Sequence, residues 1–182
     1  MMSYSSAVQL LGSFCAPVIC NPFLIFPCLT IEVKGLSSAV ESIRQNRHNG
    51  AVMLRNLRHL RLKAGMSEEK LREEFDQRTH VLSLSIAQDT MSIHCHWTGF
   101  QTGNLEYYSA HVKSLPLHEA KRWPDAVTFC RNAIDWVIRQ NKTWIQEDLA
   151  TIQTQIDAGS MPPPSSPAQS SRERSRSSDS SP

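Results

Sequence analysis

The chain has 182 residues, of which 40% are hydrophobic and 20% are charged, and its formal net charge at pH 7 is +2. This length and composition indicate one modest globular domain with disordered ends and argue against a second full domain. The net charge is too small to identify a nucleic-acid-binding protein by itself, so the local distribution of charge carries more information.

The N-terminal segment contains no charged residue before Glu32. A signal peptide or membrane segment is therefore one alternative, but three prolines interrupt the apolar stretch and no basic region precedes it. We expect an irregular segment over residues 1–22, with no membrane association. The five cysteines are odd in number and contain no C-x-x-C pair, which favours reduced thiols in an intracellular protein over a zinc site. They are Cys15, Cys20, Cys28, Cys95 and Cys130.

The first predicted strand covers residues 24–34 and reads as buried on both faces, with Pro27 at an edge, a bulge or the strand entrance. Gly35 and the following serines predict a turn. A long helix is expected over residues 38–62, because apolar residues recur there at helical spacing. These residues are Ile43, Met53, Leu54, Leu57, Leu60 and, just beyond, Ala64. Gly50 lies on the same side and predicts a close approach of helix and strand.

Residues 66–78 form a charged segment that predicts a helix capped by Ser67, which we interpret as a surface insertion. Alternating apolar residues then predict two strands, one around residues 82–86 and one around 93–97, joined by a turn at residues 88–90. A further strand is expected over residues 105–113. The sheet therefore has at least four strands.

Pro124 suits the first turn of a helix whose apolar stripe runs from Ala126 to Val137, and a break is expected near Asn141. A second helical stretch carries apolar residues from Ile145 to Ile156 and ends before Gly159. The tail over residues 159–182 is rich in Ser, Pro and Arg, so it is predicted to be disordered. The fold class is α/β in the broad sense (α+β), with a mixed sheet of about four strands flanked by helices over residues 23–158.

The end of the first strand is the place where the sequence hints at chemistry. Glu32 and Lys34 are two residues apart, so alternation in a strand puts both on one face of the sheet. A carboxylate beside an ammonium group could hold a divalent metal and position a water. The alternative is a surface salt bridge between the two with no catalytic role.

Several short motifs follow one another in a characteristic order: FPCLTIEVKG, RQNRHNGAVML, a strand ending in HCHW, EYY and RNAIDWV. In this order and spacing, over residues 24–157, they resemble a fungal family of uncharacterised PD-(D/E)XK nuclease-like domains. The resemblance implies a restriction-endonuclease-like core and metal-assisted hydrolysis of phosphodiester bonds.

The resemblance also implies roles for individual residues. Glu32 would bind Mg²⁺ together with the backbone carbonyl of Val33. Lys34 would orient the attacking water and stabilise charge on the phosphate, and Gln45 would face the site from the following helix. The superfamily normally supplies a second acidic ligand on an earlier strand, but no Asp or Glu precedes Glu32. The chain is then either truncated at its N-terminus or degenerate in its active site, and enzymatic activity is left open.

The long helix offers a separate indication of function. Five arginines fall within an arc of roughly 120° on a helical wheel, away from the apolar side, and such a stripe could track the phosphates of DNA or RNA. They are Arg44, Arg47, Arg55, Arg58 and Arg61. An ordinary solvated face is the alternative. DNA or RNA as a partner makes a nuclear location one possibility for an intracellular protein.

Two further features allow other interpretations. His94 and His96 share one face of a strand, as metal ligands would, but hydrogen-bonded or exposed histidines are the commoner case. A sheet with an open edge would favour association with another chain, so a homo-oligomeric interaction protein is a third hypothesis.

Overall fold

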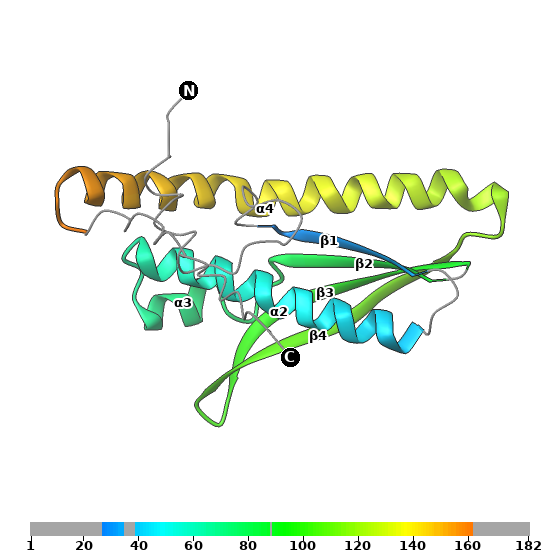
Figure 1. Cartoon of the computed structure of the whole chain (residues 1–182), viewed down its shortest axis with the longest axis horizontal. Coiled ribbons are helices and arrows are strands. Elements are labelled where there is room, and N and C mark those ends of the chain that lie inside the picture. The colour runs from blue at the N-terminus through cyan, green and yellow to red at the C-terminus, as the bar shows by residue number, and fades with distance from the viewer. Residues whose placement is uncertain (1–26, 35–38, 88, 162–182) are drawn as a thin grey trace, which may run out of the picture.

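The computed structural model describes residues 27–34, 39–87 and 89–161; for residues 34, 39 and 120 it describes the backbone alone. The predicted irregular segment over residues 1–22, residues 24–26 of the predicted first strand, the turn at Gly35 and the tail from residue 162 onward lie outside the described residues. Within them the predicted class is confirmed. A mixed four-stranded sheet is flanked by helices (Figure 1).

The sheet has the strand order β1-β2-β3-β4, with the elements β1 (Leu29–Lys34), β2 (Val81–Ala87), β3 (Thr90–Gln101) and β4 (Asn104–Pro116). β1 and β2 are parallel, and helix α2 (Ala39–Lys63) connects them. β2, β3 and β4 pair antiparallel, with a bulge between Ile93 and His94. This arrangement agrees with the short turn predicted between β2 and β3.

β1 lies at an edge of the described sheet, and this corrects the prediction that it is buried on both faces. Ile31 is 54% exposed and Val33 is 67% exposed. A continuous apolar run is typical of a strand covered on both sides, but in the described part of the chain no element covers these two side chains fully.

The helices α2 and α4 (Trp123–Asp157) lie on opposite faces of the sheet (Figure 1). The buried apolar residues of α2 include Met53, Leu54 and Leu57, as the periodicity predicts. On the other face, Ala126 of α4 packs with Leu84 and other apolar residues of the sheet. Beyond the sheet, the C-terminal half of α4 packs directly on the end of α2, where Leu60, Leu149 and Ile152 form a buried cluster.

The short helix α3 (Glu68–Glu74) begins as predicted, because the backbone N–H of Lys70 donates to Ser67 Oγ over 3.3 Å. Its interpretation as a surface insertion is wrong. Leu71 and Phe75 are almost completely buried in the same cluster as Leu54 and Leu57. One apolar side chain per turn is enough to anchor this otherwise charged segment to the core.

The predicted break near Asn141 is also wrong, since α4 runs without interruption through that residue. Asn141 is 1% exposed, and its side-chain amide donates to the carbonyl of Val137 over 2.9 Å and to the carbonyl of His80 over 2.8 Å. A buried asparagine that is hydrogen-bonded in this way is compatible with a helix interior. Pro124 lies in the first turn, as predicted, and Gly159 follows the helix with φ of +69°.

Two smaller predictions concern the cysteines and the membrane. Cys28, Cys95 and Cys130 are free thiols, as predicted, while Cys15 and Cys20 lie outside the described residues. None of the helices in the described part is both long and apolar enough to cross a membrane.

Candidate functional site

The sheet face beneath α2 is polar, whereas the face beneath α4 is apolar. The register pairs Thr30 and Glu32 of β1 with Ser83 and Ser85 of β2, and Ser83 in turn with His94 of β3. Ser83, Ser85 and His94 are buried. Because cross-strand partners share a face, these side chains form a polar layer under the helix. We call this layer the polar seam.

His96, also on this face, fixes the distance between α2 and the sheet. Its Nε2 lies 2.7 Å from Ser83 Oγ, and its ring is 1% exposed. A Cβ added at Gly50 of α2 would lie 2.3 Å from His96 Nδ1. The predicted close approach at Gly50 is therefore confirmed. Burial, with the nearby His94 and Arg47, lowers the pKa of His96 to about 4, so the imidazole is neutral at pH 7.

His94 differs from His96 in its surroundings. Its ring lies 5.4 Å from that of His111 on β4, and burial, followed by the nearby His111 and Arg47, lowers its pKa. Neutral imidazoles can bind metals, but no group of three or more His, Cys, Asp or Glu side chains among the described residues is placed to hold a metal ion. His96 is thus part of the hydrogen bonding of the seam, and His94 packs within it against His111.

Glu32 lies half-buried in register with Ser85, and the backbone of Lys34 is in register with Ala87. The predicted ligands for Mg²⁺ are the Glu32 carboxylate and the Val33 carbonyl. Mg²⁺ needs a near-octahedral set of oxygens, and among the described residues Glu32 belongs to no group of three or more His, Cys, Asp or Glu side chains placed to hold a metal ion. The described residues therefore do not fit a magnesium centre.

Gln45 is half-buried, and its side-chain amide donates to Asn49 Oδ1 on the same helix over 3.0 Å. The residues of α2 that enter the seam are instead Ser42 and Asn46, each 1% exposed. The Ser42 hydroxyl and both polar atoms of the Asn46 amide have no hydrogen-bond partner in the described structure. Buried polar groups are normally paired, so Ser42 and Asn46 are the polar side chains of α2 that distinguish this part of the seam.

The sequence contains a signal for Ser42 and Asn46 that the prediction did not use. They precede Gly50 at intervals of four residues, and Gly50 was placed on the sheet-facing side. Residues four apart on a helix share a face.

The five predicted arginines divide into two groups. Arg44, Arg47 and Arg55 are exposed on α2, as a phosphate-binding stripe requires. We call these three the arginine stripe. Arg58 and Arg61 point inward instead, which corrects the expectation that all five line one solvated face.

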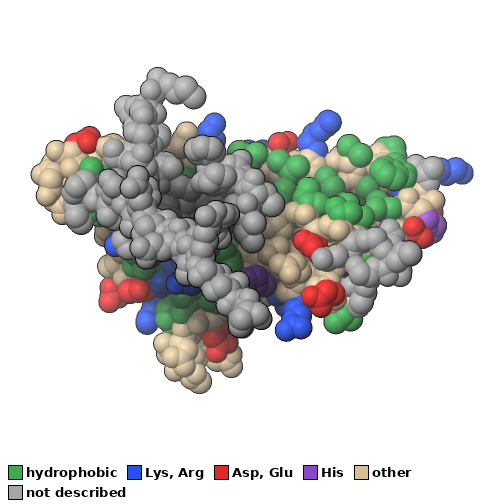
Figure 2. Space-filling view, viewed as in Figure 1, with side chains coloured by type: hydrophobic (Ala, Val, Ile, Leu, Met, Phe, Trp, Pro, Cys, Tyr) green, Lys and Arg blue, Asp and Glu red, His purple; other side chains and the backbone are tan. Residues whose placement is uncertain are grey.

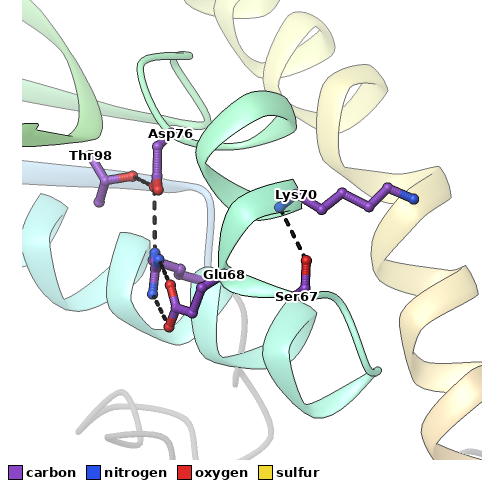
Figure 3. A network of polar contacts seen from close by, with 6 residues as sticks. Ser67, Glu68, Lys70, Asp76 and Thr98 are labelled. Carbon is purple, nitrogen blue, oxygen red and sulfur yellow. Dashed lines mark hydrogen bonds and ion pairs between the residues drawn. The ribbon is translucent and has the colours of Figure 1, made fainter.

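Arg58 belongs to a network that joins α2, α3 and β3 (Figure 3). Its side chain is 8% exposed, pairs with Glu68 and lies 3.4 Å from Asp76 Oδ1. Thr98 of β3 donates to the same Asp76 oxygen over 2.5 Å. Arg58 therefore serves the packing of these elements.

Arg61 is held in a similar way farther along the helix. Its Nε lies 3.6 Å from Asp148 Oδ2 on α4, and its guanidinium lies 4.4 Å from the centre of the Trp144 ring. Burial raises the pKa of Asp148 to about 6, although Arg61 acts in the opposite direction. Neither Arg58 nor Arg61 is free to contact an external phosphate.

A small polar pocket of about 200 Å³ adjoins the arginine stripe on the β4 side. Arg47 and Ala51 of α2 line it, together with His96, Tyr107, Tyr108 and Ser109. Tyr107 is 41% exposed. A guanidinium, tyrosine rings and hydroxyl groups around one hollow can bind an anionic group and stack against a planar one.

The fold and site define an α+β domain in which a polar seam and an arginine stripe lie together on one helix-covered face. The chain belongs to the family described as Domain of unknown function (DUF7924), whose model matches residues 9–149. No curated protein and no solved structure gave a significant match.

Proposed function

We propose that this chain is a noncatalytic nucleic-acid-binding module that contacts phosphates through Arg44, Arg47 and Arg55. The observation that carries the proposal is the exposure of these three arginines beside the polar pocket, while Arg58 and Arg61 are used internally. Helical positions 44, 47 and 55 follow one side of α2, so they can meet successive phosphates of one strand.

The neighbouring pocket supports single-stranded nucleic acid as the preferred ligand. Tyr107 offers an exposed ring close to the stripe, and any base can stack on a tyrosine. A duplex keeps its bases stacked internally, so it would use the arginines but not the ring. The proposal is compatible with a relationship of this chain to the PD-(D/E)XK nuclease-like proteins of fungi. That relationship rests on the sequence motifs alone.

The test is a binding titration with labelled single- and double-stranded oligonucleotides. Arg47→Gln/Arg55→Gln should weaken binding by about tenfold or more, because each charge-assisted contact to a phosphate is lost. The matched control is Arg131→Gln/Arg139→Gln, which removes the same charge from exposed positions of α4. Equal affinity for wild type and the stripe variant, or equal loss in both variants, would refute the proposal.

Metal-dependent phosphodiester hydrolysis is the second candidate function, and the placement of Glu32 in the polar seam is the observation that favours it. Hydrolysis ranks second because the described residues around Glu32 fit Mg²⁺ poorly. Incubation of labelled DNA with Mg²⁺ or Mn²⁺ should give no cleavage above that of Glu32→Gln. Cleavage that disappears in both Glu32→Gln and Lys34→Met would replace the binding proposal with an enzymatic one.

A further inference from the structure

A long apolar groove lies on the face of the sheet opposite to α2, between α4 and the β1 edge (Figure 1). Hydrophobic side chains gather there in Figure 2, over the part of β1 that lies next to α4. Six of them are large and at least 36% exposed: Ile31 and Val33 of β1, and Trp123, Val127, Ile134 and Ile138 of α4. Apolar patches of this extent usually mark an interaction surface.

Two hollows make up the groove. One, of about 520 Å³, has Ile86, Trp123 and Val127 in its lining, and the other, of about 310 Å³, has Pro27, Leu29 and Ile138. Ile134 lines both, so the two hollows adjoin at this residue along the helix. The surface is thus an elongated track suited to a strand or an extended segment.

We propose that residues 9–26 of this same chain occupy the groove. The chain enters the described structure at Pro27, and Pro27 and Cys28 are themselves part of the groove lining. The segment contains no charged residue and is rich in Leu, Ile and Phe. The match to the family begins at residue 9, so the segment belongs to the family's domain.

The length of the segment fits the groove. An extended chain covers about 3.3 Å per residue, so residues 9–26 reach about 60 Å. The stretch of α4 from Trp123 to Ile145 rises about 1.5 Å per residue and is about 33 Å long. The segment can therefore cover both hollows and shield Ile31 and Val33 at the sheet edge. Covering this edge would also remove a site of unwanted pairing between chains.

Hydrogen exchange of the full-length chain, followed by mass spectrometry, tests the proposal. Amides in residues 9–26 should exchange about tenfold or more slowly than in a synthetic peptide of that segment, because docking protects them. Ile134→Asp/Ile138→Asp should abolish this protection. Val127→Asp, at a 53% exposed position, provides a second groove variant if the first fails to fold. The control is Val112→Asp, a 51% exposed position on β4 away from this groove.

Loss of protection in the groove variants and its retention in Val112→Asp would support the proposal. Three outcomes would overturn it: exchange at the peptide rate in the wild type, protection that both groove variants retain, or protection that arises only in a dimer. Light scattering on the same samples identifies the last outcome, in which a second copy of the chain occupies the groove.

Discussion

At the scale of single residues, Gly50 is the described glycine where an added side chain would meet the closest contact. An alanine there would gain about 1 kcal/mol in helix propensity, but its methyl group would overlap the His96 ring. We expect Gly50→Ala to destabilise the fold by about 1–3 kcal/mol, as overpacking typically does. In the background of His96→Ala the same substitution should be neutral or stabilising. Urea denaturation of the wild type, the two single variants and the double variant measures the effect of Gly50→Ala in both backgrounds. Stabilisation of the wild type by Gly50→Ala would contradict the packing described.

His96 also predicts how stability depends on pH. Its pKa is lowered from 6.5 to about 4 in the folded state, so the unfolded chain binds the proton more readily. The contribution of His96 to stability is therefore fully present above pH 6.5 and decreases as the pH falls toward 4. Asp148 acts in the opposite sense, because its raised pKa favours the folded state at low pH. The comparison of wild type with His96→Gln isolates the histidine.

The expected difference in unfolding free energy between wild type and His96→Gln falls by roughly 2–3 kcal/mol from pH 7 to pH 4. Denaturation curves at several pH values give this difference directly, because the contribution of Asp148 is common to both proteins. A difference that is constant across this range would show that His96 is not held neutral by burial.

At the scale of secondary-structure elements, the Arg58 network predicts unequal effects for its two acidic members. Asp76 is 1% exposed, so Asp76→Ala leaves the Arg58 charge buried with a solvated partner only, at a cost of about 3–5 kcal/mol. Glu68 is 52% exposed, and Glu68→Ala should cost less than about 1 kcal/mol. Thermal and chemical denaturation of both variants provide the comparison, and similar losses would contradict the assignment of Asp76 as the internal partner.

Asn141 provides the corresponding test for α4. Asn141→Leu leaves the carbonyl of His80 without its donor, so we expect a loss of about 1–3 kcal/mol although leucine favours the helix. Thr143→Leu, at an exposed position of the same helix, is the control. If Asn141→Leu is as stable as Thr143→Leu, the hydrogen bond to the carbonyl of His80, just before β2, does not anchor the helix.

The elements that the sequence predicted well have strong local signals. The bounds of α2 agree within a residue, since the turn signal at Gly35 precedes the helix and the apolar stripe continues to its end. The continuity of α4 was missed because the partner of Asn141 lies on a distant segment. The inward orientation of Arg58 was missed for the same reason, since a helical wheel shows neither Asp76 nor Glu68.

At the scale of the whole molecule, the two helix-covered faces of the sheet differ in polarity. The α2 face combines buried polar groups with the arginine stripe, and the α4 face carries the apolar core and the groove beside β1. The sequence predicted part of this division, because Ser83, Ser85 and the two histidines alternate with apolar residues. The groove beside β1 could not be predicted from the sequence, because its exposure depends on how much of the sheet edge α4 covers.

The most direct test of the proposed arginine interface is the salt dependence of binding to a labelled single-stranded oligonucleotide. If Arg44, Arg47 and Arg55 contact phosphates, the triple Gln variant should bind more weakly and lower the slope of log K against log salt by about two. Arg131→Gln/Arg139→Gln should leave the slope unchanged. An identical slope for the wild type and the triple variant, or the absence of binding by the wild type at low salt, would contradict the proposed interface.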